Sequence, residues 1–403
     1  MNAVGIDVSK GKSMVSVLRP LGVVVTKPFE VGHTTSELHT LADYIKSLDG
    51  ETKIILEHTG RYYEPVAQAL HDAGIFVSAV NPKLIKDYGN NSLRKVKTDK
   101  SDSRKIARYG LDNWTELRQY TPVDTIRSQL KTMNRQFDLY TQTKVSMKNN
   151  LISLLDQTYP GVNTLFKSPA REDGSQKWVD FAESFWHLDC VRSLSPVAFT
   201  ERYRKFCKRH GYNFSSVKAA EIHAGADEQI AVLPKSPLTK LLIQQALDQL
   251  KTISKTVEML RVEMDRLAAQ LPEYPVVMKM SGVGKSLGPQ LMAEIGDVTR
   301  FAHKGAVAAF AGVDPGANQS GSYEAKRTSS SKRGSPRLRK TLFLVMSALL
   351  ETKPFDDAVY QFLDKKRAEG KPYYVYMTAG ANKFLRVYYG RIKEYLALLE
   401  SSK

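Results

Sequence analysis

Two segments of the chain carry apolar residues at intervals that alternate between four and three, and this spacing constrains the fold more than any other feature. The series runs through residues 126–154, where Lys144 interrupts it once, and without interruption through residues 243–271. A spacing of this kind predicts a long helix with one continuous apolar seam, as in coiled coils. Each seam can pack within one chain or against a second copy of the chain, and the sequence leaves both arrangements open.

The first 110 residues alternate instead between strand-like and helix-like patterns. We expect strands at residues 3–9, 13–19, 23–31, 53–57 and 76–80, and helices at residues 36–48, 64–73 and 98–111. In chain order this gives three strands, followed by helix, strand, helix, strand and helix. Such an order predicts an α/β domain with a mixed sheet flanked by helices.

The length of 403 residues exceeds the ~100–200 residues of one domain. We expect an α/β domain at residues 1–114, a first coiled-coil or linker helix at 115–159, a helical insertion at 160–238, a second coiled-coil helix at 239–273 and a mostly α-helical C-terminal domain at 274–403. In the last segment, a glycine-rich turn at residues 280–284 precedes a predicted helix at 287–295. This pattern has the form of a phosphate-binding helix-hairpin-helix turn, and a tight turn between two core helices fits it equally well.

The chain is strongly basic. Lys and Arg outnumber Asp and Glu by 59 to 42, which gives a formal net charge of +17. An excess of this size favours a polyanionic partner, and nucleic acid is the leading candidate. Most of the candidates for phosphate contact lie in two basic runs, at residues 83–108 and 326–340, and one lysine follows the glycine-rich turn. They are Lys83, Arg94, Lys95, Lys97, Lys100, Arg104, Lys285, Lys326, Arg327, Lys332, Arg333 and Arg337.

The sequence predicts a soluble protein of the cytoplasm with no membrane partner. No apolar stretch approaches the ~20 residues that cross a bilayer, and the first residues lack the pattern of a signal peptide. Two cysteines, Cys190 and Cys207, are too few for a disulfide framework, which fits a reducing compartment.

The cysteines also lie near histidines. His187 and Cys190 are three residues apart, as are Cys207 and His210, and this spacing resembles that of zinc ligands. Alternatively, both pairs belong to the core of short helices, because aromatic residues adjoin them. We prefer the second interpretation and do not expect zinc.

Four carboxylates are the candidates for a metal site. Asp7 lies inside an apolar strand and Glu57 ends another, and ionised carboxylates at such places are costly without a cation or hydrogen-bond donors. Asp99 and Asp102 share one face at the start of a predicted helix, where they also suit the helix dipole. Together the four groups would form a hard oxygen site suited to Mg²⁺ or Mn²⁺.

Motifs at both ends of the chain carry a resemblance to a known family. GIDVSK at 5–10, EHTGRYYEPVAQAL at 57–70, NPKLIKDYG at 81–89 and KTDKSDSRKIARYG at 97–110 resemble the N-terminal domain of the DEDD insertion-sequence transposases. The run from MSGVGK to GANQSGS at 280–322 resembles the second domain of the same family. The resemblance implies a RuvC-like (ribonuclease H-like) α/β domain and a C-terminal transposase domain, and it assigns no role to residues 160–238.

The family is understood as bridge-RNA-guided recombinases, in which a noncoding RNA pairs with target and donor DNA. Carried over by position, the resemblance implies that Asp7, Glu57, Asp99 and Asp102 hold Mg²⁺, with Mn²⁺ as a substitute. It also implies that Ser320 is the nucleophile and forms a covalent phosphoserine intermediate. The residues alone do not distinguish Ser320 from Ser322 or from the serines at 329–331.

The partners that follow from the resemblance are target DNA, donor DNA, the bridge RNA and further copies of the chain. We expect a homo-oligomer, a dimer or tetramer formed through the coiled coils, in the nucleoid of a prokaryotic cytosol. Whether one active site is shared between subunits is left open.

Three other functions share features of this sequence. A RuvC-like endonuclease or junction resolvase would use the same carboxylates with metal-activated water. A non-catalytic nucleic-acid-binding assembly protein would use them structurally. An actin-like kinase also opens on a Gly-Ile-Asp strand, but Ser9-Lys10-Gly11-Lys12 lacks the expected phosphate loop.

Overall fold

The computed structural model describes residues 1–58, 60–88, 98–122, 124–316, 319–320, 323–324 and 329–402. The chain divides into two compact units, Met1–Val123 and Asp124–Lys403, and each is described by itself. None of the helices in the described ranges is both long enough and apolar enough to span a membrane.

The first unit is built on a five-stranded sheet of order β3-β2-β1-β4-β5. Strands β1 and β3 pair with β2 in antiparallel fashion, whereas β4 lies parallel to both β1 and β5. The predicted mixed sheet is therefore confirmed. The strands are β1 (Asn2–Val8), β2 (Lys12–Arg19), β3 (Val23–Gly32), β4 (Thr52–Glu57) and β5 (Phe76–Val80).

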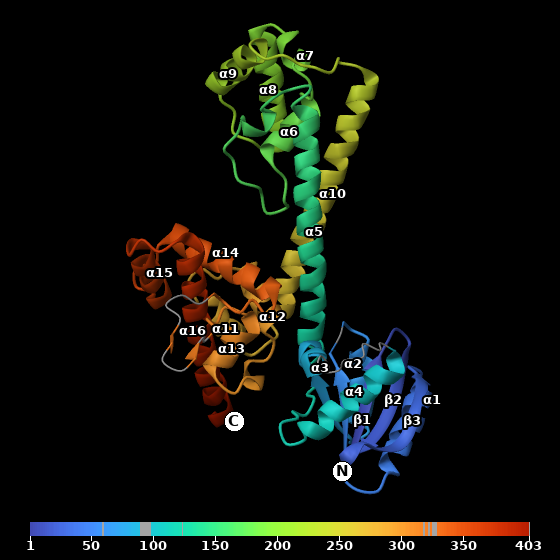
Figure 1. The fold of residues 1–403 in the computed structure, drawn as a ribbon. Coiled ribbons are helices and arrows are strands. Elements are labelled where there is room, and N and C mark those ends of the chain that lie inside the picture. Colours follow the sequence, from blue (N-terminus) through green and yellow to red (C-terminus); the bar gives the residue numbers. More distant parts are fainter. Residues whose placement is uncertain are drawn as a thin grey trace. The chain divides into compact units, whose positions relative to one another are not determined.

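Helices cover both faces of this sheet (Figure 1). They are α1 (Thr35–Lys46), α2 (Tyr63–Asp72), α3 (Pro82–Tyr88) and α4 (Asp99–Asp112). Successive strand residues point to opposite faces. Ile6 and Leu56 accordingly pack in the core shared with α1 and α2, whereas Ala3 and Ile55 pack in the core shared with α3 and α4. The odd-numbered positions of β1 and β4 thus face α4.

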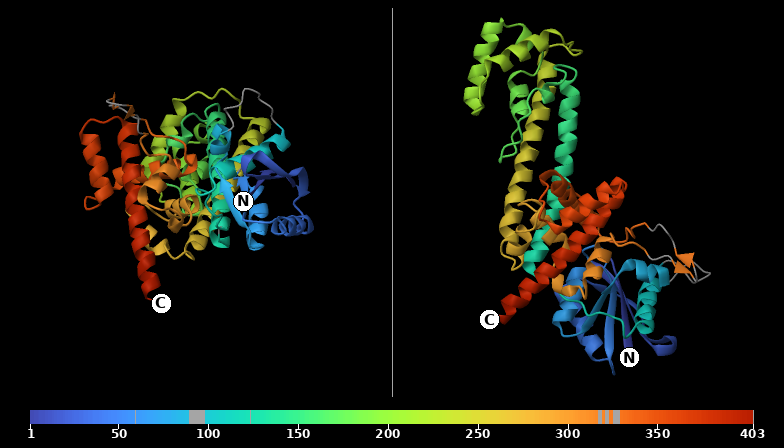
Figure 2. Two further views of the ribbon diagram at one scale, coloured as in Figure 1. Left: turned by 60° about the horizontal axis from the view of Figure 1, so that its bottom comes forward. Right: turned by 90° about the vertical axis from the view of Figure 1, so that its left-hand side faces the viewer.

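The second unit contains the two long helices that the heptads predict. They are α5 (Thr125–Leu155) and α10 (Pro237–Ala268), and they lie side by side within one chain (Figures 1 and 2). Seam residues such as Leu130, Leu151 and Leu250 are buried. Of the two arrangements left open by the sequence, the structure contains packing within the chain.

Two further cores adjoin this helix pair. One belongs to the insertion and is rich in aromatic residues, with Phe181, Phe185 and Tyr203 fully buried. Its helices are α6 (Lys177–Ser184), α7 (Asp189–Arg192), α8 (Pro196–His210) and α9 (Ser216–Asp227). The other core belongs to the C-terminal segment. Its elements are α11 (Tyr274–Met278), α12 (Leu287–Ile295), α13 (Lys304–Ala311), β6 (Gln319–Ser320), β7 (Tyr323–Glu324), α14 (Pro336–Thr352), α15 (Ala358–Ala368) and α16 (Tyr373–Ser401).

Candidate active site

Close backbone packing holds α4 against the sheet. A Cβ atom on Gly5 of β1 would lie 2.1 Å from the backbone oxygen of Ser103, and one on Gly110 of α4 would lie 2.3 Å from Cδ1 of Ile55. The hydroxyls of Ser16 and Ser103 are 2.7 Å apart in the same buried layer. A glycine inside a strand often marks such an approach of another backbone, and here it fixes the distance between α4 and the two central strands.

This packing decides on which side of the sheet Asp7 and Glu57 lie. Gly5 pairs with Ile55 in the parallel register, and both contact α4. Asp7 and Glu57 are each two residues further along their strands, so they point to the same face. They therefore lie next to each other at the carboxyl ends of neighbouring parallel strands, on the side covered by α4.

The first turn of α4 brings a third carboxylate to this edge. Thr98 is the N-cap of the helix, and its side chain and that of Ser101 form a capping box that fixes where the helix begins. Asp102 lies in the first turn, one turn before the buried Ile106. The face of α4 that packs on the sheet thus carries Asp102 towards the ends of β1 and β4.

The electrostatics agree with this placement. Glu57 is half-buried, and burial together with the charge of Asp7 raises its pKa above the ordinary value. Asp102 raises the pKa of Glu57 further, whereas Lys105 lowers it. Asp7 and Asp102 therefore both lie within electrostatic reach of Glu57.

The fourth candidate, Asp99, lies at the edge of this group. It is exposed, and its charge contributes to the raised pKa of Lys12, whose main cause is a hydrogen bond to Glu30. In the ranges that the structure describes, no three carboxylate, imidazole or thiol side chains are close enough together to hold one metal ion. The structure thus gathers three of the four carboxylates into an acidic neighbourhood without closing them into a coordination shell.

The donors in this neighbourhood suit a hard divalent cation. All are carboxylate oxygens, which Mg²⁺ and Mn²⁺ prefer over nitrogen or sulfur. Burial first, and then the charges of Asp7 and Asp102, raise the pKa of Glu57, and a bound cation would offset the repulsion between these carboxylates.

Ser320 belongs to the second unit, where it is part of the short ribbon β6–β7 and its backbone pairs with Tyr323. Its side chain and Ser322 lie outside the described residues. The two arms that lead to the ribbon are joined by backbone hydrogen bonds from Gly316 to Ser329, 3.3 Å, and from Ser331 to Asp314, 3.0 Å. We call the two paired arms, residues 312–316 and 329–334, the neck. The β6–β7 ribbon with Ser320 lies between these two arms in the sequence.

Two glycines tighten this neck. A Cβ atom on Gly334 would lie 2.1 Å from the backbone oxygen of Phe310, and one on Gly312 would lie 2.6 Å from the backbone nitrogen of Gly334. Gly312 also has φ of +66°, a conformation that favours glycine. Ser331, one of the alternative serines, donates its hydroxyl to Asp314 at 2.6 Å and so contributes to the neck.

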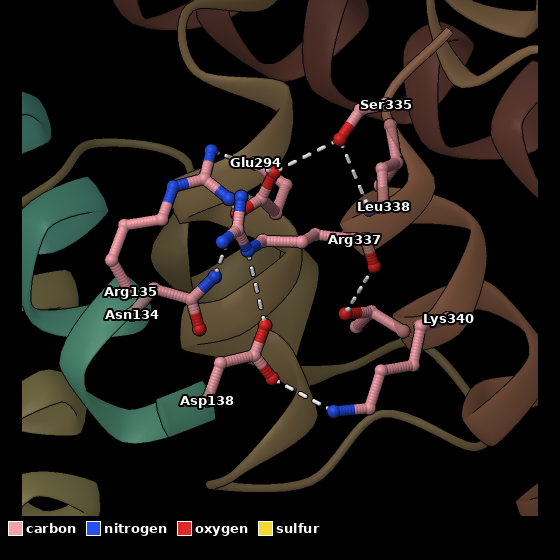
Figure 3. A network of polar contacts seen from close by, with 9 residues as sticks. Asn134, Arg135, Asp138, Glu294, Ser335, Arg337, Leu338 and Lys340 are labelled. Carbon is pink, nitrogen blue, oxygen red and sulfur yellow. Dashed lines mark hydrogen bonds and ion pairs between the residues drawn. The ribbon is translucent and has the colours of Figure 1, made fainter. Parts of the chain in front are cut away.

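A partly buried polar network connects the start of α14 to α12 and to the long helix α5 (Figure 3). Ser335, the N-cap of α14, donates to Glu294 of α12, and Glu294 also accepts from Asn134 of α5 at 2.8 Å. Asp138 of α5 pairs with Lys340 at 2.8 Å and with Arg337 at 3.4 Å. The sequence analysis missed this network, because its members on α5 are more than a hundred residues away from those on α12 and α14. The polar side chains at 134 and 138 beside the seam were the available signal.

The predicted phosphate contacts fall into three groups. Lys100 and Arg104 are exposed on α4, as is Lys83 on α3. Lys285, Lys332 and Arg333 are exposed in the second unit, where Arg337 is partly engaged by Asp138. The remaining candidates, Arg94, Lys95, Lys97, Lys326 and Arg327, lie outside the described residues.

The histidine and cysteine pairs of the insertion have other partners. Nε2 of His187 donates to the backbone oxygen of Leu233 at 3.0 Å, and Nδ1 accepts from the backbone nitrogen of Asp189 at 3.0 Å. Cys207 is buried in the aromatic core next to Phe206. Both observations favour the core interpretation over zinc ligation.

Comparisons with known proteins now identify the family. A family model described as a transposase, of the DEDD type of IS110 elements, matches residues 4–160. A second model, described as transposase of the IS116/IS110/IS902 family, matches residues 274–361. The two models together cover more than half of the chain, which belongs to the IS110 family of DEDD transposases and is thus an enzyme of DNA transposition.

Other comparisons add less. No curated protein matches the chain. The RuvC of T. thermophilus, solved in complex with a Holliday junction substrate, is similar over 29% of this chain and 96% of its own, with 13% sequence identity and a TM-score of 0.24.

Proposed function

We propose that this transposase is a Mg²⁺-dependent recombinase that cuts and rejoins DNA through Ser320. The observation that best supports the proposal is the strand register, which sets Asp7 beside Glu57 on the face that α4 covers. Burial and the charges of Asp7 and Asp102 also raise the pKa of Glu57. Half-buried carboxylates with perturbed pKa values are typical of functional sites. Asp7, Glu57, Asp102 and Asp99 would hold the metal, with Asp99 joining from the first turn of α4.

The metal would supply charge stabilisation at the scissile phosphate and lower the pKa of a bound hydroxyl. In the first step, Oγ of Ser320 forms a bond to phosphorus while the bond to one bridging oxygen breaks. The serine loses its proton and the released strand end gains one. In the second step, a hydroxyl of the joining strand attacks the phosphoserine, which restores Ser320 and the phosphodiester without a further energy source.

The choice of Ser320 among neighbouring serines has two supports. The resemblance assigns the role to this position, and the hydroxyl of Ser331 is engaged with Asp314.

A covalent-adduct assay tests the nucleophile. Wild-type protein, incubated with labelled DNA and Mg²⁺, is expected to retain label after denaturing electrophoresis, and Ser320→Ala is expected to lose it. Ser329→Ala, in the neck with an exposed side chain, is the matched control and should keep it. If metal-dependent cleavage survives in Ser320→Ala, the result would favour the endonuclease alternative. That alternative needs only the acidic residues, and all of them belong to the first unit.

We further propose that a noncoding RNA of the element supplies the sequence choice. The net charge of +17 suits a phosphate-rich partner, and base pairing by RNA would leave the protein to recognise backbone and shape. Sequencing of RNA that copurifies with the protein tests this: a transcript from beside the gene is expected, and recombination of a defined site by RNA-free protein would refute guidance.

A further inference from the structure

A basic cavity of about 290 Å³ lies between α5, α10 and the loop that precedes α6. Lys144 and Lys148 of α5 line one wall, Lys251 and Lys255 of α10 line another, and Arg171 of the loop lies at a third side. Lys144 is the residue that interrupts the apolar seam of α5. The interruption thus marks the place where the two long helices leave room for a cavity next to the insertion.

The cavity holds more positive than negative charge. Two carboxylates also line it, but Asp180 pairs with Lys251 at 3.5 Å and accepts from Tyr212 at 2.7 Å, and Asp173 accepts from the backbone nitrogen of Ser175 at 2.9 Å. Lys251 also pairs with Glu183 at 2.7 Å. The acidic groups are therefore committed to neighbours.

The other lysines are not compensated in this way. In the part of the chain that the structure describes, no carboxylate lies within ion-pair distance of Lys144, Lys148 or Lys255. Lys144 and Lys148 are half-buried and lie four residues apart on one helix face. Lys251, which is half-buried, and Lys255, which is exposed, have the same spacing on the other helix. Like charges at this spacing repel, so the arrangement is unfavourable until an anion enters.

Arg171 is held in place at the cavity. Its guanidinium stacks on Tyr212 with 4.0 Å between its central carbon and the ring centre, and it donates to the backbone oxygens of His210 and Gly211 at 2.7 Å and 3.1 Å. Gly174, with φ of +79°, seats the same loop on α10, where a Cβ atom would lie 3.2 Å from the backbone oxygen of Ser254. The cationic wall is therefore built by local contacts.

The size and lining of the cavity indicate which anion fits. Its volume is near the ~300 Å³ at which small-molecule pockets begin, so it admits a group of nucleotide size and not a length of duplex. Among the described residues that line it there is no Phe, Tyr or Trp on which a base could stack. Lysine and arginine side chains are the usual partners of phosphate.

We propose that this cavity binds a backbone phosphate of a single nucleic-acid strand, RNA or DNA. The insertion thereby gains a role, since its loop completes a phosphate site on the helix pair. The inference rests on the proposed function only in taking nucleic acid as the partner. It needs neither the carboxylates nor Ser320.

Binding of the full-length chain to fluorescent single-stranded oligonucleotides tests the proposal. RNA and DNA of the same sequence are titrated without divalent metal, at several salt concentrations. The test variant is Lys144→Gln with Lys148→Gln. The control is Lys205→Gln with Lys240→Gln, which removes the same charge from exposed positions on α8 and α10 outside the cavity. A single variant, Lys144→Met, restores an apolar seam and checks that lost binding does not come from unfolding.

The test variant is expected to weaken binding roughly tenfold and to reduce the slope of log K against log salt by roughly 0.7, as the loss of one single-strand phosphate contact would. The control should change both much less, and Lys144→Met should bind weakly with an undiminished unfolding temperature. If the test variant loses affinity for only one of the two oligonucleotides, that nucleic acid is the source of the phosphate. If it loses affinity for both, the cavity accepts the backbone of RNA and of DNA.

Equal effects of test and control variants would overturn the proposal. A second outcome would also overturn it: the test variant binds both strands as the wild type does, and adenosine monophosphate raises the unfolding temperature of the wild type alone. The cavity would then bind a free nucleotide and not a strand. Since binding is measured without cleavage, failure here is distinct from failure of the adduct assay with Ser320→Ala.

Discussion

Gly5 of β1 lies so close to α4 that a Cβ atom on it would be 2.1 Å from the backbone oxygen of Ser103. This contact sets the separation of helix and sheet, and the separation in turn places Asp102 near Asp7 and Glu57. The acidic group therefore depends on a residue that carries no functional atom of its own.

Gly5→Ala tests this dependence. The added methyl group meets backbone atoms that cannot rotate away, so α4 must shift, and such overpacking costs typically ~1–3 kcal/mol. We expect a lower unfolding temperature and a strong loss of metal-dependent DNA cleavage. Gly225→Ala on α9 is the control, because nothing lies within 4 Å of its Cβ position. If Gly5→Ala retains wild-type stability and cleavage, the close contact does not control the site.

Glu57→Gln is expected to change how stability depends on pH in metal-free buffer. Burial and the charges of Asp7 and Asp102 raise the pKa of Glu57 above its ordinary value of 4.5, so the folded state holds this proton more tightly than the unfolded chain. Stability contributed by the protonated form is complete below pH 4.5 and is lost as the pH rises through the raised pKa.

The variant lacks this loss. The difference in unfolding temperature between Glu57→Gln and the wild type should therefore grow in favour of the variant as the pH rises from 4.5 through the raised pKa of Glu57. At higher pH the difference should stay constant. Glu51→Gln, at an exposed position before the same strand, should follow the wild-type profile. Parallel profiles for Glu57→Gln and wild type would contradict the proposed repulsion.

Metal binding should stabilise the wild-type protein. A cation that binds only the folded state raises the unfolding temperature with its concentration. We expect added Mg²⁺ to raise that temperature, EDTA to reverse the effect, and Asp7→Asn to abolish it together with cleavage. Asp43→Asn, exposed on α1 at the opposite face of the sheet, is the control. An equal Mg²⁺ effect in Asp7→Asn would place the cation elsewhere.

Local patterns predicted most of the fold. The strand at 76–80 was predicted with the bounds that β5 has, and the helix at 98–111 differs from α4 by one residue at each end. Alternating and apolar runs suffice for such elements because burial on one or two faces determines them. Helix α3 was missed, since its seven residues are too few to show helical periodicity.

The candidate site was less accessible to sequence reasoning. The placement of Asp7 within one apolar strand and of Glu57 at the end of another was predictable from the apolar residues beside them. The approach of α4 at Gly5 and the pairing of Asp138 with Lys340 depend on contacts between distant segments, which no local pattern contains. The heptads likewise predicted two long helices but could not decide between packing within the chain and packing between chains.

The last prediction concerns the neck, whose two arms flank the ribbon with Ser320. Gly334→Ala places a methyl group 2.1 Å from the backbone oxygen of Phe310, so the two arms must separate. We expect the covalent adduct with DNA to fall strongly, while the Mg²⁺-induced stabilisation, which belongs to the first unit, remains. Gly316→Ala is the matched control in the same neck, because the backbone oxygen of Ser329, the nearest atom to the Cβ position, is 4.0 Å away. Adduct formation at the wild-type level in Gly334→Ala would show that Ser320 is positioned without the neck.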